Sequence, residues 1–284
     1  MSTPSPDEVR DRMAQMWDRA APAWGKRAEA VLAMGMPVST WMIEQLRLQP
    51  GDKLLELAAG PGDTGFLASE LISPGGTLIT SDGSEAMLEV ARTRAEALGI
   101  RNVEFRQLSL EWIDLPTAEV DKVLCRWGIM LTVDPAAALL ETRRVLRPGG
   151  RLAMAVWDAP EENPWATIPT RALVELGHID PPDRNGPGMF ALAVPGRLEE
   201  MLEDAGFVDP IVEGVAIERN YPDTDSYLRE TSELSPMFSD AVGALDEASW
   251  TEVNARITEL LAPYTAAGGE LRLPGRSLAA VANA

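Results

Sequence analysis

Two carboxylates and a glycine-rich turn stand out in the first third of the chain. Glu56 interrupts the apolar run from Lys53 to Leu57, and Gly60 and Gly62 follow closely. Glycines at such a turn let the backbone bend tightly and approach a ligand. A carboxylate there would repel a pyrophosphate, and it suits a ligand that carries an ammonium or sulfonium group. We therefore expect a cationic ligand at this turn.

Asp82 is the second carboxylate, and it ends the β-branched run from Thr77 to Thr80, about twenty residues beyond the glycines. An acid at this position accepts hydrogen bonds from the hydroxyls of a ribose. Alternatively, it would cap the helix that follows. Gly60, Gly62 and Gly65 also fit the dinucleotide fingerprint, so the glycines alone leave an NAD(P) cofactor open.

The chain contains one histidine and one cysteine. His178 is the side chain whose ordinary pKa lies nearest neutrality, which makes it a candidate general base, although a solvated loop histidine is the alternative. Cys125 follows Val123 and Leu124 and is expected to be a buried strand thiol. Such a composition predicts no intramolecular disulfide and no metal site.

The elements that must position these residues alternate between strands and helices. Helical periodicity begins at Phe66, directly after the first strand and the glycine turn. Further strands are expected near 77–80, 102–106, 121–125, 151–157 and 211–219, and the segments 270–274 and 277–281 are expected to form a final hairpin-like strand. Alternation of this kind predicts a doubly wound α/β sheet that binds its ligand at the carboxyl ends of the strands.

Helical segments and an irregular insertion flank this pattern. Residues 1–50 are expected to form an arm, with a first helix that breaks at a Pro/Gly segment after Trp24 and a second from Ser39 to Leu46. Residues 158–196 are rich in proline, glycine and asparagine around one helix, and such long insertions usually have a function. Residues 221–263 are mostly helical in pattern.

Composition excludes several classes of partner. The formal net charge is -19 and the pI is near 4.5, and a surface that acidic disfavours nucleic acids and anionic membranes. We see neither a signal peptide nor an apolar stretch long enough to span a bilayer. These features predict a cytoplasmic protein, and they leave the oligomeric state open, a homodimer included.

Several motifs together resemble the class I S-adenosylmethionine-dependent methyltransferases, and within them the group around the ubiquinone/menaquinone-biosynthesis C-methyltransferases. The resemblance covers about residues 10–220 and rests on the segments 17–21, 54–66, 125–130, 143–150 and 156–165. Arg147-Pro148-Gly149-Gly150, which leads directly into a strand, has no counterpart in the dinucleotide fingerprint. This segment therefore favours the methyltransferase over an NAD(P)-dependent oxidoreductase.

The resemblance implies roles for named residues around S-adenosylmethionine. Glu56, with the backbone of Ala58 and Gly60 in the turn that Gly62 completes, would hold the methionine amino group. Asp82 would bind the ribose. Other residues expected to contact the cofactor are Gly83 and Met87 beside the ribose and adenine, and Arg126 and Trp127 at the methionine end and the methyl-transfer face. Trp24 of the arm would either cover the cofactor or only fasten the arm to the core.

The chain departs from the family pattern at the adenine. Where the family usually has an aspartate after the third strand, this sequence has Ser109, followed by Leu110 and Glu111. The adenine contact is therefore expected from Ser109, from the Leu110 backbone or from Glu111. This departure is also the feature that favours a methyltransferase-like binding protein without catalysis.

The sequence thus predicts a Rossmann-like, doubly wound α/β fold with a mostly parallel sheet of seven strands. We expect a helical arm at 1–50 and a methyltransferase domain at 51–284, with cap insertions at about 158–196 and 221–265. The expected activity is methyl transfer to a small, apolar or aromatic acceptor, such as a quinone, a phenol or a polyketide. Arg126 and His178 are the candidate catalytic residues.

Overall fold

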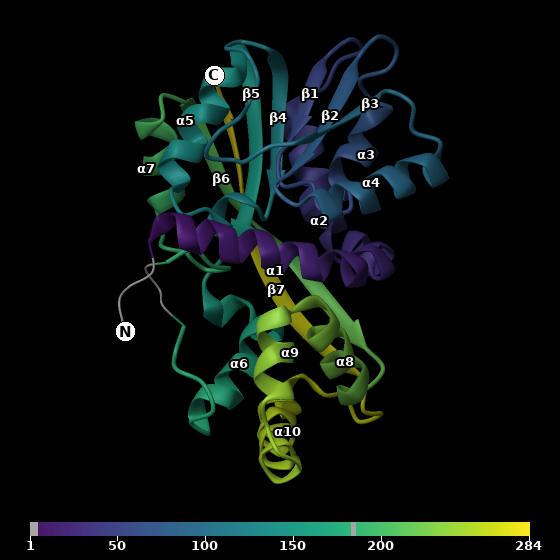
Figure 1. The fold of residues 1–284 in the computed structure, drawn as a ribbon, viewed down its shortest axis with the longest axis vertical. Helices are drawn as coiled ribbons and strands as arrows, with labels where there is room; N and C mark the ends of the chain where they lie inside the picture. Colours follow the sequence, from purple (N-terminus) through teal and green to yellow (C-terminus); the bar gives the residue numbers. More distant parts are fainter. Residues whose placement is uncertain (1–4, 183–185) are drawn as a thin grey trace.

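A computed structural model describes residues 5–182 and 186–284. Residues 1–4 of the expected arm and 183–185 of the expected 158–196 insertion lie outside the described residues. A seven-stranded sheet in the order β3-β2-β1-β4-β5-β7-β6 forms the centre of the fold (Figure 1). Its strands are β1 (Lys53–Glu56), β2 (Thr77–Asp82), β3 (Val103–Gln107), β4 (Val120–Arg126), β5 (Leu146–Trp157), β6 (Val208–Tyr221) and β7 (Leu271–Asn283).

Strands β1 to β5 are parallel, and β7 runs antiparallel between β5 and β6. The prediction of a doubly wound, mostly parallel sheet is confirmed. Apolar side chains of β1, β2, β4 and β5 are almost fully buried, as expected for strands that are covered on both faces, whereas Val208 and Ile211 of the edge strand β6 are exposed. All five parallel strands end at the same edge, and this edge carries the chemistry-bearing residues.

Helices cover both faces of the sheet. Helix α2 (Ala28–Leu46) packs on α3 (Asp63–Ser69) and on β5, β6 and β7, and α4 (Glu85–Leu98) packs beside β2 and β3. Helices α5 (Pro135–Val145) and α7 (Arg197–Asp204) contact each other over β5 and β6. None of the helices in the described ranges has the length and apolar character needed to cross a bilayer.

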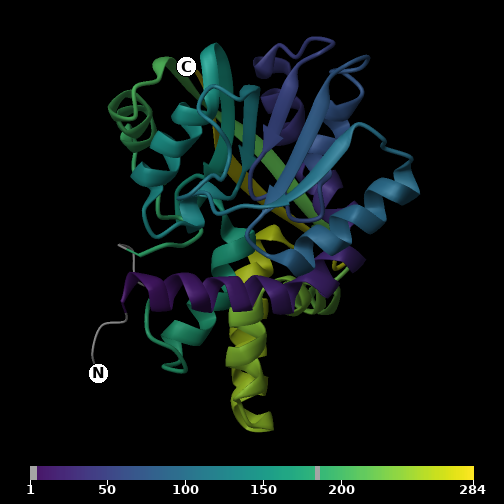
Figure 2. The ribbon, with the colours of Figure 1, turned by 45° about the horizontal axis from the view of Figure 1, so that its top comes forward.

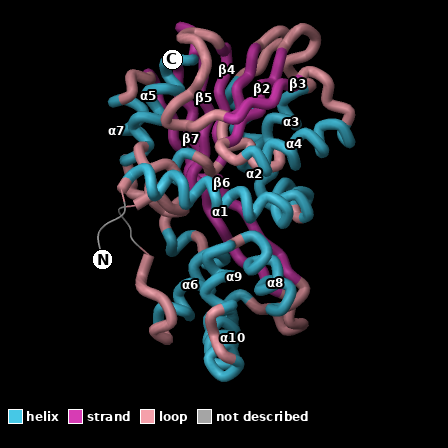
Figure 3. Tube along the Cα trace, in the orientation of Figure 1, coloured by secondary structure: helices cyan, strands magenta, loops and turns pink. Residues whose placement is uncertain are grey.

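Strands β6 and β7 continue beyond the sheet as a two-stranded ribbon (Figure 3). The last partner of β5 on β7 is Ser277, whereas β6 and β7 stay paired as far as Tyr221 and Leu271. Four helices gather on this ribbon: α6 (Pro164–Glu175), α8 (Thr224–Leu234), α9 (Pro236–Gly243) and α10 (Glu247–Leu261). We call these helices with the ribbon end the cap. It has a core of its own, separate from that of the sheet.

Helix α1 (Pro6–Lys26) crosses the molecule between the sheet and the cap, as Figures 1 and 2 both show. Helix α1 ends at Lys26, close to the expected break after Trp24, and it continues through Pro22; the second helix begins at Ala28 and not, as expected, at Ser39. Proline removes one helical hydrogen bond. Packing outweighs that loss, since Ala20 and Ala21 are buried against Met87 of α4.

The two segments expected to form the final strand belong to one strand that pairs antiparallel with β6. Residues 271–283 form one continuous strand, β7, although Pro274 and Gly275 look like a turn. Pro274 lies beyond Ser277, where β6 is the only strand in the described ranges that pairs with β7. A residue without an N–H is tolerated at such an edge position.

Candidate functional site

The glycine turn after β1 forms the floor of the candidate site. Ala58, Gly60 and Gly62 all have positive φ angles of 49°, 52° and 85°. Such angles are costly for a residue with a Cβ, so Ala58 is a strained point of the backbone. A Cβ built on Gly60 would meet nothing within 4 Å, whereas one on Gly62 would overlap the ring of Phe66. The open space over Gly60 is where a ligand can approach the loop.

Glu56 lies beneath this turn rather than in the open space. It is 2% exposed, and its carboxylate accepts a hydrogen bond from the Gly65 N–H at 2.7 Å. Burial raises the pKa of Glu56 to about 8, against the opposing effect of the Gly65 hydrogen bond. A Cβ on Gly65 would overlap the carboxylate, so this third glycine is required by close packing. Glu56 therefore ties α3 to β1.

Asp82 ends β2 and holds the turn from the other side. Its two oxygens accept from the N–H groups of Gly60 at 2.8 Å and Ser84 at 2.9 Å. Burial raises the pKa of Asp82, while these hydrogen bonds oppose the rise. Ser84, not Asp82, caps the next helix, since its hydroxyl accepts from the Met87 N–H. The alternative interpretation of Asp82 as a helix cap is thus wrong.

Arg126 ends β4, on the other side of β1 from Asp82. Its side chain is 9% exposed, and Nη2 donates to Asp63 Oδ2 at 3.1 Å. This ion pair is therefore buried and not a surface pair. The same Asp63, with a fully buried side chain, also pairs with Arg94 at 2.7 Å. Burial lowers the pKa of Arg126, while the nearby Asp63 opposes this.

Sequence reasoning missed Asp63 and the glycine that faces Arg126. Asp63 is the first residue of α3, where an acid is ordinary because it complements the helix dipole. Gly35 of α2 lies against the guanidinium, and a Cβ there would overlap Arg126 Nη1. No local signal marks either contact, because the partners are far apart in the sequence.

An aromatic stack extends from Arg126 into the cap. The guanidinium lies 4.4 Å from the ring centroid of Trp127, and Trp127 stacks on Trp157 with ring centroids 4.2 Å apart. Trp165 of α6 meets Trp157 edge-on at 5.0 Å, and Arg219 of β6 covers Trp165 at 4.3 Å. Trp127 has a φ angle of 60°, a costly conformation for an aromatic residue. We call this set the tryptophan stack.

The loop after β3 brings the adenine candidates together. Ser109 is exposed and its hydroxyl accepts from the Glu111 N–H at 3.3 Å, and Leu110 is half-buried. Glu111 is already engaged: Oε2 accepts from Arg10 of α1 at 2.5 Å, and Oε1 accepts from the Val133 N–H at 2.8 Å. Glu111 therefore fastens the arm to this loop, which leaves Ser109 and the Leu110 backbone freer to meet a ligand.

The arm also reaches the ribose side and the cap. Asp18 of α1 accepts from the Ser84 hydroxyl at 2.5 Å. Trp24 packs in a small cluster with Met87 of α4, and its indole N–H donates to the carbonyl of Leu234 at the end of α8. Gly83 is exposed between these contacts. Trp24, Gly83 and Met87 thus lie together on the side of Asp82.

The structure does not bring His178 to this edge. It follows α6, whose far end is about 18 Å from its start at 1.5 Å per residue, and its backbone N–H donates to the Leu173 carbonyl. There it faces Asp246, the residue that caps α10, and contributes to lowering the pKa of that carboxylate. Cys125 is buried, as expected.

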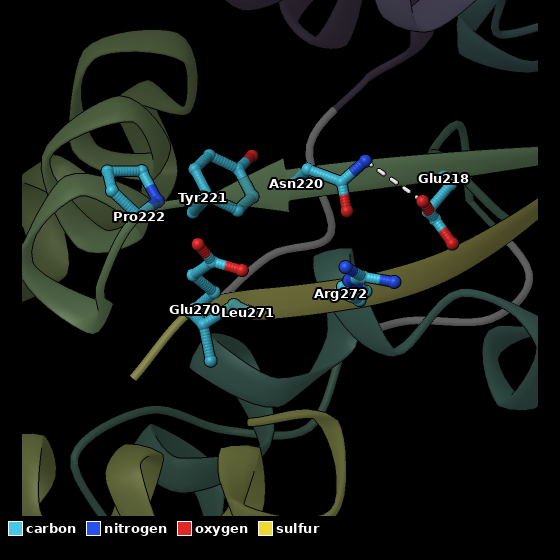
Figure 4. A pocket seen from close by; sticks show the side chains of 7 residues that line it. All are labelled: Glu218, Asn220, Tyr221, Pro222, Glu270, Leu271 and Arg272. Atoms are coloured by element: carbon cyan, nitrogen blue, oxygen red, sulfur yellow. Dashed lines mark hydrogen bonds between the residues drawn. The ribbon is translucent and has the colours of Figure 1, made fainter. Parts of the chain in front are cut away.

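Two cavities flank the end of β6. The larger, of about 590 Å³, lies between α2, the end of β6 and α8, and Arg27, Met34, Arg219, Arg229 and Glu230 are among its lining residues. The smaller, of about 460 Å³, is lined by Glu218, Asn220, Tyr221, Pro222, Glu270, Leu271 and Arg272 (Figure 4). Met34 precedes Gly35, so the larger cavity adjoins the arm residue that covers Arg126.

These residues fit S-adenosylmethionine. Asp82 keeps acceptor capacity for a ribose, since each carboxylate oxygen has a second lone pair. Arg126 Nε and Nη1 are buried and have no hydrogen-bond partner in the ranges 5–182 and 186–284, and they suit an amino-acid carboxylate. Across the same ranges, no group of three or more His, Cys, Asp or Glu side chains is placed to hold a metal ion.

Comparison with known proteins agrees with this geometry. The model of the methyltransferase domain family matches residues 48–180. The chain is 30% identical over 177 residues to the ubiquinone/menaquinone biosynthesis C-methyltransferase UbiE of Shewanella baltica, which covers 59% of this chain and 70% of that protein. It is 38% identical over 178 residues to an uncharacterized 37.1 kDa protein from a transposon of Streptomyces fradiae, covering 60% of this chain and 48% of that protein.

The chain thus matches about half the length of the Streptomyces relative. Among solved structures, the cyclase SpnF has a TM-score of 0.57 at 17% identity, with 99% of this chain and 97% of that chain covered. At this identity the likeness concerns the fold alone. The family model, the UbiE relative and the fold show that the chain belongs to the class I S-adenosylmethionine-dependent methyltransferases.

Proposed function

We propose that this methyltransferase acts on a small, apolar or aromatic acceptor held where the arm, the carboxyl edge of the sheet and the cap meet. The tryptophan stack carries this proposal. Three indoles pack one on another between Arg126 and the cap, and aromatic faces of this kind favour flat, apolar partners. The UbiE relative is named for quinone biosynthesis, which supports the same class of acceptor.

The cofactor supplies a methyl group on a sulfonium centre. In this proposal Asp82 binds the ribose, Ser109 or the Leu110 backbone meets the adenine, and Arg126 and Trp127 line the methionine end. Glu56 stays in its buried position beneath the turn, where the ammonium group of a bound cofactor would favour its ionised form. The main contribution of the protein is then to align the methyl donor with the nucleophile of the acceptor, because an in-line displacement requires that the two are held in the correct relative orientation.

A histidine base is not part of the proposal. His178 lies a helix length away from the stack, and Tyr221 and Arg219 are both bound to Glu230. We infer that the acceptor supplies its own nucleophile, as an electron-rich ring carbon or an already acidic hydroxyl does. Replacing His178 by Gln should therefore leave the turnover rate unchanged within about twofold.

We further propose that residues 1–50 act as a lid over the cofactor and that the segments at 158–196 and 221–265 shape the acceptor site. The arm reaches every side of the site. It contacts Glu111 through Arg10, Ser84 through Asp18 and Arg126 through Gly35. Cofactor entry then requires that α1 and α2 move away from the sheet edge.

Isothermal titration with S-adenosylhomocysteine tests the proposed cofactor-binding site. Asp82→Asn should weaken binding at least tenfold. The charged carboxylate would accept hydrogen bonds from both ribose hydroxyls, and the loss of such charge-assisted hydrogen bonds has an effect of about this size on affinity. Asp121→Asn is the matched control. Asp121 accepts from the Lys53 N–H at the opposite edge of the sheet, so this change should leave binding intact.

A methyl-transfer assay then separates the enzyme from a binding protein without catalysis. The purified protein is incubated with S-adenosylmethionine and a panel of quinols, phenols and polyketides, and the release of S-adenosylhomocysteine is followed. Turnover of an aromatic member supports the proposal. Tight cofactor binding with no turnover across the panel would instead favour the binding protein that the departure at Ser109 suggests.

A further inference from the structure

The larger cavity, of about 590 Å³, has two unlike walls. Helix α2 supplies an apolar wall with Ala30, Ala33 and Met34, which recur at helical spacing and therefore share one face of the helix. The end of β6 and helix α8 supply a polar wall that includes Arg219 and Arg229. A cavity of this size, with an apolar side and a few polar groups, is typical of sites that bind a small organic molecule.

The lining of this cavity is positively charged in an acidic chain. Three arginines, Arg27, Arg219 and Arg229, line it together with two carboxylates, Glu218 and Glu230, whereas the whole chain has a formal charge of -19. An excess of cations along a recess attracts anions and raises their local concentration. The lining therefore favours a ligand that carries a negative charge.

Arg219 is held in place and keeps donors for such a ligand. Its side chain is 9% exposed, and the guanidinium lies 4.3 Å from the centroid of the Trp165 ring. Nη2 donates to Glu230 Oε1 at 2.5 Å, and the Tyr221 hydroxyl donates to the same oxygen at 2.9 Å. The bond to Glu230 uses one of the five N–H groups of the guanidinium. Because the ring contact already orients the planar group, a second acceptor can bind at a small entropic cost.

Arg229 is the second cation on this wall. It is exposed, and it forms no ion pair within the ranges 5–182 and 186–284. Two carboxylates close to it along the chain are engaged elsewhere. Asp223 caps α8 by accepting from the Ser226 N–H at 2.7 Å, and Glu233 pairs with Arg27 at 2.5 Å. Arg229 can therefore turn its charge toward a ligand in the cavity.

We propose that the methyl acceptor is an aromatic carboxylic acid whose carboxylate is bound by Arg219 and Arg229 in the larger cavity. The inference rests on the proposed function, because it adds an acidic group to the acceptor of that site. The planar fork of a guanidinium matches the two oxygens of a carboxylate. The apolar face of α2 suits the ring of the same molecule.

The cavity also lies beside the site of methyl transfer in the proposed function. Met34 lines the cavity and directly precedes Gly35. A Cβ at Gly35 would overlap Arg126 Nη1 and would lie 3.2 Å from the Trp127 ring. An acceptor with its carboxylate at Arg219 and its ring along Met34 therefore points its far end toward the carboxyl edge of the sheet.

The test compares acids with their uncharged analogues. Isothermal titration measures binding of hydroxybenzoates, hydroxycinnamates and hydroxynaphthoates, and of the matching amides, to the full chain saturated with S-adenosylhomocysteine. For the wild type we expect at least one acid to bind about tenfold or more tightly than its amide, as charge-assisted hydrogen bonds imply. Arg219→Gln should reduce this ratio to about threefold or less. Arg229→Gln should reduce it by a smaller factor, because solvent screens an exposed charge.

Two further variants make the result specific. Arg219→Lys keeps the charge but loses the planar fork, so it should retain only part of the ratio, and it serves if Arg219→Gln does not fold. Arg272→Gln is the matched control. Arg272 lines the smaller cavity and not the larger one (Figure 4), so the ratio should stay at the wild-type value.

The outcomes separate this inference from the proposed function. If no acid binds the wild type more tightly than its amide, or if the ratio is undiminished in the Arg219 and Arg229 variants, the inference is overturned; methyl transfer to a neutral phenol or quinol would then leave the proposed function standing. An equal loss in Arg272→Gln and Arg219→Gln also overturns it, since the effect would be general. Absence of methyl transfer to every acid and every neutral acceptor overturns both.

Discussion

Glu56 should make the stability of the protein fall as the pH rises, and Glu56→Gln should remove that dependence. The folded chain holds a proton on Glu56 up to a pKa of about 8, whereas the ordinary pKa of this group is 4.5. Between these values the unfolded chain binds fewer protons than the folded one. Stability from this group is therefore full below pH 4.5, falls through the window and levels off above pH 8.

The expected magnitude follows from the same shift. Each pH unit inside the window costs about 1.4 kcal/mol, so about 3 kcal/mol is lost between pH 5 and pH 7.5. Glutamine keeps an oxygen for the Gly65 N–H but does not titrate. The free energy of unfolding of Glu56→Gln relative to the wild type should therefore rise by about 3 kcal/mol over this interval.

Urea unfolding at several pH values, followed by tryptophan fluorescence, measures this difference. The control is Glu104→Gln, since Glu104 is a half-exposed carboxylate paired with Arg106 on β3. Its unfolding curves should run parallel to those of the wild type at every pH. If the Glu56→Gln curves also run parallel to the wild type, burial does not hold the proton on Glu56 and the reasoning fails.

Three further predictions concern the arm and the tryptophan stack. Gly35→Ala should weaken S-adenosylhomocysteine binding by about tenfold or more in calorimetry, because the new Cβ displaces Arg126; unchanged affinity would mean that α2 does not cover the site. Glu233→Gln should speed amide hydrogen exchange in α1 about three- to tenfold by removing the ion pair with Arg27, while exchange in β4 stays constant. Trp165→Leu should lower the free energy of unfolding by about 2–3 kcal/mol through lost stacking and packing, and a change below 0.5 kcal/mol in urea unfolding would contradict this.

The sequence predictions that the structure confirms depend on local patterns in the sequence. The strand, glycine turn and helix that begin at Lys53 lie within a short stretch, and periodicity and turn chemistry specify them without help from distant residues. Asp82 could be located for the same reason, as the last residue of a β-branched run. The sequence did not decide whether Asp82 caps the helix or holds the glycine turn. The structure decides this, because Ser84 takes the capping position and Asp82 accepts from the Gly60 N–H.

What the sequence did not predict depends on partners far along the chain. Asp63 and Arg126 form their ion pair across separate elements, and neither residue type is unusual where it stands. Glu111 looked free to meet the adenine until Arg10 of α1 was seen to bind it. Pro22 shows the same limit, because burial of the neighbouring alanines against α4 outweighs a helix-breaking residue.

The β6–β7 ribbon has a consequence for how such a protein can change its substrate. Residues 222–270, which include α8, α9 and α10, are inserted between the last paired residues of the two strands, Tyr221 and Leu271. The rest of each strand belongs to the sheet. New sequence can therefore replace this insertion without changing the register of any sheet pair or the turn that carries Gly60. If these helices shape the acceptor site, as proposed above, the acceptor can change through this insertion while the residues proposed to bind the methyl donor stay the same.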